Sequence, residues 1–214
     1  MTVRQIYQQF FIPPNLQNHM VTVAKISSII ANHWQNNNDF VISDLIKVAL
    51  LHDLGNIVKF DFDKFPQFLG TEISNIQFWK DKQTEIIQKY GKDDHEVTKA
   101  MLNELKTDQR LIDIILAKSF DNSITINNSN DWLTKILRYS DLRVMPNGIG
   151  SLQQRLDEIK NRITKYQNNP ELPKLIQACF DNENKIQAKV DFDLKTINQD
   201  LINSDKFDYL NIEI

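Results

Sequence analysis

Hydrophobic residues recur at three- and four-residue spacing along most of the chain, which is the pattern of amphipathic helices. The first long run predicts a helix over residues 15–34. Its apolar positions are Leu16, Met20, Val23, Ile26, Ile29 and Ile30. Strict alternation of apolar and polar residues is rare, and only the C-terminal FDYLNIEI is ambiguous between strand and other structure.

The stretch VALLHDLGNIVKF at residues 48–60 ends a second predicted helix. Ser43 is expected to cap the start of this helix, and Gly55 to end it in the left-handed conformation. His52 and Asp53 are therefore expected in its last turn. This position matters because the chain leaves helical geometry there, so two neighbouring side chains can reach one point.

Further helices are predicted by periodicity and by capping residues at their ends. Gly91 closes one helix, Asp93 or Asp94 opens the next, and Ser151 with Gln154 forms a capping-box pattern that opens a helix of about 17 residues. The remaining predicted helices cover residues 72–90, 95–105, 108–120, 131–145, 171–188 and 192–204, and Asp141 falls in the final turn of the one that stops at Pro146. The Asn-rich stretches NNND and INNSN are expected to be solvated loops.

Composition supports one all-α domain over residues 1–214, because five Gly and six Pro leave few helix breakers. Hydrophobic residues make up 41% and charged residues 25%, typical of a soluble globular protein. A net charge of −3 without a basic stripe argues against an extended nucleic-acid surface. No apolar run is long enough for a membrane span and the N-terminus lacks a signal-peptide core. Together with the lone Cys179, expected to be a buried thiol, this favours a cytoplasmic protein without a membrane partner.

Candidate chemistry rests on four histidines, at positions 19, 33, 52 and 95, and on nearby aspartates. Imidazole and carboxylate groups that project inward from different helices can share a metal ion. His19, His52, Asp53 and Asp141 could form such a group. Each also has an ordinary interpretation as a core or surface residue, with Asp141 paired to a neighbouring arginine, and spacing alone leaves this open.

The order of NHMVTVAKI, ALLHDLGN and KILRYSDLRVMPNGI resembles the HD-domain metal-dependent phosphohydrolase superfamily over residues 15–158. The resemblance implies an all-α HD-domain bundle, with residues 159–214 as a C-terminal helical extension. It implies one catalytic centre whose metal ligands are His19, His52, Asp53 and Asp141. This donor set suits Mn²⁺, Fe²⁺, Co²⁺, Ni²⁺ or Zn²⁺ better than Mg²⁺.

Two departures from the family pattern affect the expected chemistry. His95 matches an additional ligand of dinuclear members, but Lys118 and Ser119 stand where those members carry another histidine, so one ion per chain is expected. Asn56 stands where some members carry Lys or Glu. Asparagine cannot act as a proton donor in the way an acid does, so Asn56 either orients a water or phosphate oxygen or caps the turn at Gly55.

The resemblance implies phosphoester hydrolysis by a metal-activated water, with Asp53 as the expected proton acceptor. His95 is expected to contact the metal, a second ion or a substrate phosphate, or to be a solvated residue at a helix start. Arg143 is the preferred candidate to bind phosphate, ahead of Lys59, Lys118 and Arg155, although each has an alternative as a surface cation.

The expected substrate is a nucleotide or a similar small phosphorylated metabolite. A catalytically inactive nucleotide-binding or regulatory module is the main alternative, and a helical interaction domain with structural histidines is the third. The aromatic segment FDFDKFPQFLG is open between a lid, a base-stacking wall and a hydrophobic plug. The helices after residue 151 either cover the site or form a homodimer surface.

Overall fold

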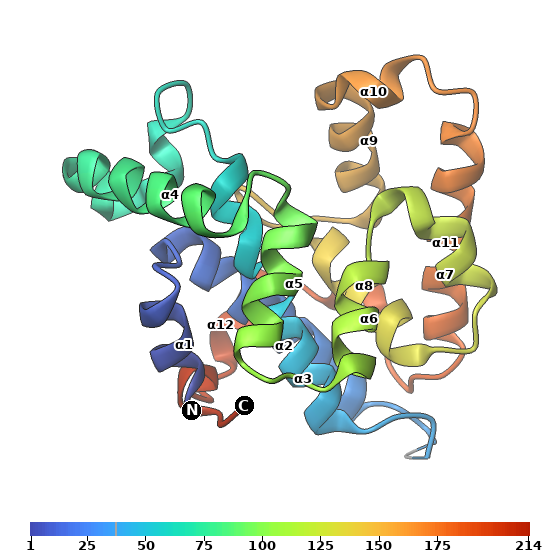
Figure 1. Cartoon of the computed structure of the whole chain (residues 1–214). Helices are drawn as coiled ribbons and strands as arrows, with labels where there is room; N and C mark the ends of the chain where they lie inside the picture. Colours follow the sequence, from blue (N-terminus) through green and yellow to red (C-terminus); the bar gives the residue numbers. More distant parts are fainter. Residues whose placement is uncertain (37) are drawn as a thin grey trace. The chain divides into compact units, whose positions relative to one another are not determined.

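Helices form nearly all the regular structure in the computed structural model, which describes residues 1–36 and 38–214 (Figure 1). The α-helices of this part of the chain are α1 (Val3–Gln9), α2 (Pro14–Asn32), α3 (Ile42–Leu51), α4 (Ile76–Tyr90), α5 (Asp94–Glu104), α6 (Gln109–Ala117), α7 (Ser123–Asn128), α8 (Trp132–Arg143), α9 (Leu152–Arg162), α10 (Thr164–Gln167), α11 (Leu172–Gln187) and α12 (Gln199–Ser204). Short 3₁₀ helices are η1 (Leu54–Lys59), η2 (Pro66–Asn75), η3 (Phe120–Asn122), η4 (Leu194–Thr196) and η5 (Tyr209–Asn211). The antiparallel strands β1 (Val144–Met145) and β2 (Gly148–Ile149) make a small hairpin after α8. The prediction of an all-α protein is confirmed.

Residue contacts divide the chain into two compact units. The first consists of Met1–Val21, Leu50–Leu116 and Phe207–Ile214, and the second of Thr22–Ala49 and Ala117–Lys206. The single domain that the sequence suggests stays a prediction.

In the first unit, the two chain ends are joined. Thr2 and Glu213 form an antiparallel bridge, and α1 packs against η5. Close packing also joins η1 to α5 and α4. The buried residues of α1 are Val3, Ile6 and Tyr7, so this short helix supplies one wall of the unit's core.

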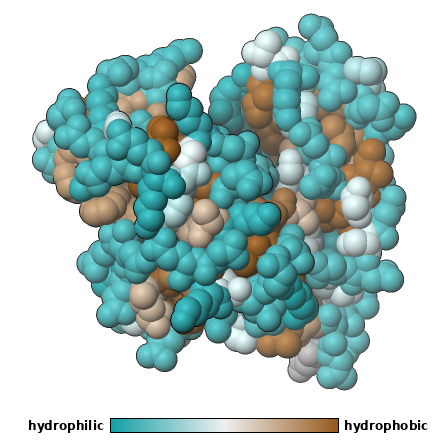
Figure 2. All heavy atoms as spheres, viewed as in Figure 1, coloured by the Kyte–Doolittle hydropathy of each residue, from teal (hydrophilic) through white to brown (hydrophobic). Residues whose placement is uncertain are grey.

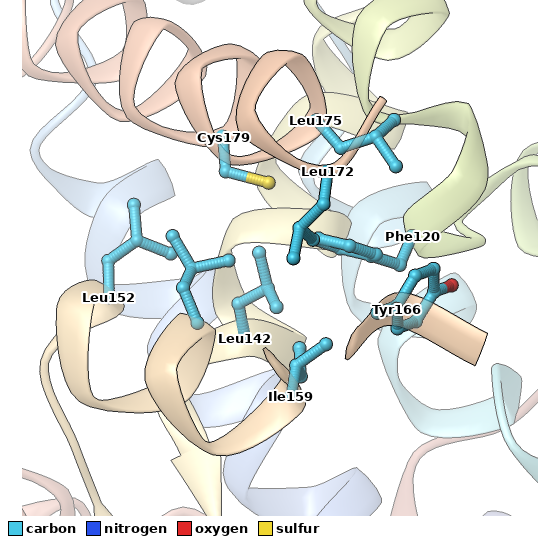
Figure 3. Packing of buried hydrophobic residues seen from close by; sticks show 9 residues of the cluster. Phe120, Leu142, Leu152, Ile159, Tyr166, Leu172, Leu175 and Cys179 are labelled. Carbon is cyan, nitrogen blue, oxygen red and sulfur yellow. The ribbon is translucent and has the colours of Figure 1, made fainter. Parts of the chain in front are cut away.

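In the second unit, a cluster of buried apolar side chains from η3, α8, α9, α10 and α11 forms a compact core (Figure 3). Its members are Phe120, Leu142, Leu152, Leu156, Ile159, Tyr166, Leu172, Leu175 and Cys179. Cys179 is a buried free thiol, as expected, and burial raises its pKa. This core fixes the end of α8, which carries Asp141.

Several predicted helix boundaries are confirmed. Gly91 ends α4 with φ 102°, Asp93 caps α5 through the Glu96 N–H, and Ser151 with Gln154 forms a complete capping box. The helix after Ser151 is shorter than expected, because it stops at Arg162 and α10 follows as a separate turn.

Other boundaries were wrong. Ser43 lies inside α3 rather than before it. The expected helix over 192–204 is interrupted, with η4 and α12 in its place. The INNSN stretch begins inside α7 instead of forming a loop, and the NNND prediction includes residue 37, which lies outside the described residues.

The aromatic segment after η1 packs largely against itself. Phe60 lies 5.8 Å from Phe62 and 5.4 Å from Phe68 between ring centroids, and Phe65 lies 5.5 Å from Phe68. Phe65 nevertheless remains exposed. Figure 2 shows that the visible face of the molecule is mostly hydrophilic, with hydrophobic residues in separate patches. Among the described residues, no helix combines the length and the apolar composition that crossing a membrane requires.

Candidate metal centre

The His-Asp pair lies in the turn that links α3 to η1. α3 ends at Leu51, so His52 and Asp53 come directly after it rather than in its last turn. The Asn56 backbone N–H donates to the Asp53 carbonyl oxygen at 3.0 Å and closes the turn. The helix end therefore lets both side chains leave the helical path, as expected.

Gly55 has a different role from the one expected. Its φ is not positive, so it is not a left-handed stop. A Cβ atom on Gly55 would lie 2.5 Å from the Asp94 carbonyl oxygen and 2.6 Å from both the backbone nitrogen and Oγ1 of Thr98. The Gly55 N–H also donates to Thr98 Oγ1 at 3.0 Å. Glycine is required here because the first turns of α5 lie directly against the backbone of η1.

Gly55→Ala is expected to lower the free energy of unfolding by about 1–3 kcal/mol, the usual cost of overpacking, and to weaken metal binding. The second effect arises because relief of the clash must move the turn that carries His52 and Asp53. Gly91→Ala is the control, since a Cβ there meets nothing within 4 Å and costs only backbone strain. Thermal unfolding and Mn²⁺ titration measure both effects. Equal loss of metal affinity in the two variants would contradict the proposed role of Gly55.

Tyr7 supports the same turn and was missed in the sequence. Its hydroxyl donates to the Leu50 carbonyl at 2.6 Å, which satisfies one of the last carbonyls of α3. Burial, followed by the negative charge of Asp53, raises the Tyr7 pKa above its ordinary value, so the hydroxyl remains a donor. The apolar spacing of Val3, Ile6 and Tyr7 was the available signal for α1, although nothing in it indicated the contact with α3.

His19 extends from the N-terminal half of α2 toward the His-Asp pair. The Nε2 atoms of His19 and His52 are 3.3 Å apart, and each lies 3.6 Å from Asp53 Oδ2. Three donors from α2 and from the turn after α3 thus face one point. The donor atoms of His19, His52, Asp53 and Asp141 all lie within 4.8 Å of one another.

The separations among His19, His52 and Asp53 fit donors around one metal ion. Donors about 2.1 Å from a common ion are about 3.0 Å apart at a right angle and about 3.4 Å apart at the tetrahedral angle. The separations of 3.3 and 3.6 Å are close to this range. Two imidazoles with two carboxylates form a mixed donor set suited to divalent transition metals. Within residues 1–36 and 38–214, the side chains close enough together to hold an ion are those of His19, His52, Asp53 and Asp141. His95 is not part of this group.

The donors differ in their access to solvent. The His52 side chain is fully buried and that of Asp53 is 9% exposed, whereas that of His19 is 22% exposed. A ligand or water can therefore approach from the side of His19. Limited exposure also strengthens electrostatic interactions within the group, because solvent screens them less.

His95 lies in the first turn of α5, close to two charged residues. Lys59 Nζ is 2.8 Å from Asp94 Oδ2, and His95 Nε2 is 3.9 Å from the same oxygen. Since the Asp94 backbone also borders Gly55, all three residues lie beside the His-Asp turn. The side chains of Lys59 and His95 are each about half exposed, so both can meet a ligand from solvent.

Arg143 lies elsewhere than predicted. It is buried, and its guanidinium donates to the carbonyls of Gly150 (2.6 Å), Leu194 (2.9 Å) and Ile197 (2.8 Å) and to the Tyr139 hydroxyl (2.5 Å). The expectation that Arg143 binds phosphate on the open side is not supported, because its donors already hold the segment after α8. Sequence reasoning could not distinguish the two roles, since the acceptors are backbone atoms as many as 54 residues away.

Comparison with known proteins adds one finding. A family model described as HD domain matches residues 16–162, which is more than half of the chain. No curated protein and no solved structure matched. The match contains His19, the His52–Asp53 pair and Asp141, so the chain belongs to the HD-domain family, the metal-dependent phosphohydrolase superfamily that its sequence resembles.

Proposed function

We propose that this protein is a metal-dependent phosphohydrolase that cleaves a phosphoester of a nucleotide or a similar small phosphorylated metabolite. The observation that carries the proposal is the group of donors from His19, His52, Asp53 and Asp141, all within 4.8 Å of one another. Family membership supports the reaction type. The substrate class rests on the resemblance and on the site's limited exposure, which favours a small substrate.

In this proposal the four donors hold one divalent ion. Such an ion lowers the pKa of water and polarises a phosphoryl oxygen. Asp53 also accepts a proton from the attacking water, because its carboxylate lies within the donor group and is nearly buried. Asn56 cannot supply a proton to the leaving group, so in this proposal that proton comes from water.

Lys59 and His95 are the proposed contacts for phosphate. Both lie around Asp94 beside the His-Asp turn, and both are accessible. Their exposure allows a substrate phosphate to compete with Asp94 for the lysine ammonium, which makes only a surface ion pair there. Arg143 is not proposed for this role, because its guanidinium already makes four interior hydrogen bonds.

The second candidate function is a regulatory module that binds a metal and a nucleotide without turnover. Asn56, Lys118 and Ser119 favour it, because they replace groups that catalytically active relatives use. The two functions share the metal centre and differ only in hydrolysis. A cytoplasmic location and a homodimer remain predictions under both candidate functions.

Hydrolysis of a panel of nucleoside monophosphates, cyclic nucleotides and simple phosphoesters tests the proposed function. The panel is assayed with metal-stripped protein, then with Mn²⁺, Co²⁺, Ni²⁺, Zn²⁺ or Mg²⁺ added singly. We expect turnover of at least one phosphoester that depends on added metal and is lost in His52→Ala. Tight metal and nucleotide binding without turnover would favour the regulatory module instead.

A further inference from the structure

Arg138 lies one helical turn before Asp141 on α8 and contacts its carboxylate. The Nη1 atom donates to Asp141 Oδ2 at 3.4 Å. Both side chains are largely buried, with 9% of Arg138 and 13% of Asp141 exposed. Water therefore weakens the attraction within this pair less than it weakens a surface ion pair on a helix.

The rest of the Arg138 guanidinium is poorly satisfied. Its Nε and Nη2 atoms are buried and have no hydrogen-bond partner among the described residues. The guanidinium lies 5.4 Å from the ring centroid of Phe120, which belongs to the apolar core of the second unit. Arg143 on the same helix uses all three of its nitrogens, so incomplete bonding is not a general feature of arginines in α8.

A buried cation with unpaired donors does not stabilise a fold. Removal of its charge from water costs several kcal/mol, and only good geometry and further hydrogen bonds offset this cost. Arg138 has one long hydrogen bond, and it also lines a small cavity with Ser123, Tyr139, Cys179 and Asn182. Among the described residues its ion pair is with Asp141, and Asp121 attracts the guanidinium without an ion-pair contact.

We propose that Arg138 is a positioning residue for the metal ligand Asp141, an inference that rests on the proposed metal centre. The guanidinium fixes the Asp141 carboxylate in one orientation. Phe120 and the core around it fix the guanidinium in turn. Outer-shell groups of this kind orient metal ligands, and their loss typically costs 10–100-fold in metal affinity.

A purely structural role for Arg138 predicts a different outcome. In that case, replacement of Arg138 by an apolar side chain of similar length changes the stability of the fold without a specific effect on metal affinity. Electrostatic repulsion predicts a third outcome, because removal of a cation beside the site would tighten metal binding. Metal affinity measured on the metal-stripped protein separates the three.

The test compares Arg138→Met with wild type by calorimetric titration of Mn²⁺ into metal-stripped protein. Arg155→Met is the matched control, because Arg155 pairs with Glu158 at the same i, i+3 spacing on α9 and is also mostly buried. We expect Arg138→Met to bind Mn²⁺ about 10–100-fold more weakly than wild type. Arg155→Met should bind Mn²⁺ with the affinity of wild type, and Arg138→Lys with an affinity between those of wild type and Arg138→Met. Arg138→Lys also provides the comparison if Arg138→Met does not fold.

Unchanged or tighter Mn²⁺ binding in a folded Arg138 variant would overturn the positioning role. The result does not depend on turnover, so it stands even if the protein proves to be a regulatory module. A wild-type protein that binds no Mn²⁺ would overturn both this inference and the metal centre.

Discussion

Asp53→Asn is expected to abolish tight metal binding and to lower metal-dependent phosphoester hydrolysis by about a thousand-fold, which corresponds to loss of several kcal/mol of transition-state stabilisation. Asp53 Oδ2 lies 3.6 Å from Nε2 of both His19 and His52. The asparagine side chain has the same shape but is neutral, so the donor set loses a negative charge while the turn keeps its packing. Mn²⁺ titration, far-UV circular dichroism and the phosphoester assay measure these effects.

Asp113→Asn is the control for this substitution. Asp113 is exposed on α6 and accepts a hydrogen bond from Gln109, outside the donor group. We expect this variant to bind Mn²⁺ like wild type. A folded Asp53→Asn protein with full metal affinity would remove Asp53 from the ligand set.

Arg143→Ala is expected to lower the free energy of unfolding by at least about 3 kcal/mol. The substitution leaves the carbonyls of Gly150, Leu194 and Ile197 without their donor, and each buried unsatisfied group costs about 1–3 kcal/mol. For a protein of this size we expect Tm to fall by roughly 6–12 °C. Differential scanning calorimetry of metal-stripped protein measures the change.

Arg155→Ala serves as the control, because its ion pair with Glu158 on one helix should contribute less than about 1 kcal/mol. A conservative Arg143→Lys variant adds a second comparison. If it kept full stability and lost hydrolysis with metal still bound, Arg143 would be a substrate contact after all.

The sequence predicted the helices that carry the site because their signals are local. Apolar periodicity defined α2 and α3, and the caps at Asp93, Gly91 and Ser151 act within a few residues. The candidate ligands were also identified, through the order of three short motifs rather than through any single one. Periodicity placed each on a helix, but it could not show that the donors face one another.

The features that sequence reasoning missed depend on contacts between distant segments. Gly55 was assigned a left-handed conformation because glycine often ends a helix, whereas the structure requires it for the close approach of α5. Arg143 was assigned to phosphate because it lies two positions beyond Asp141 in the sequence. Its backbone acceptors are the carbonyl of Gly150, which follows β2, and those of Leu194 and Ile197, in and after η4. Local spacing carries no information about such partners.

Metal content of the purified protein tests the central claim most directly. Protein prepared without a metal-affinity tag or chelator is analysed by inductively coupled plasma mass spectrometry, before and after saturation with Mn²⁺ and desalting. The account predicts one equivalent of a divalent transition metal per chain, absent from His52→Ala and retained by His33→Ala, whose imidazole pairs with Asp191 at the surface. A wild-type protein without bound metal under both conditions, or equal metal content in wild type and His52→Ala, would contradict it.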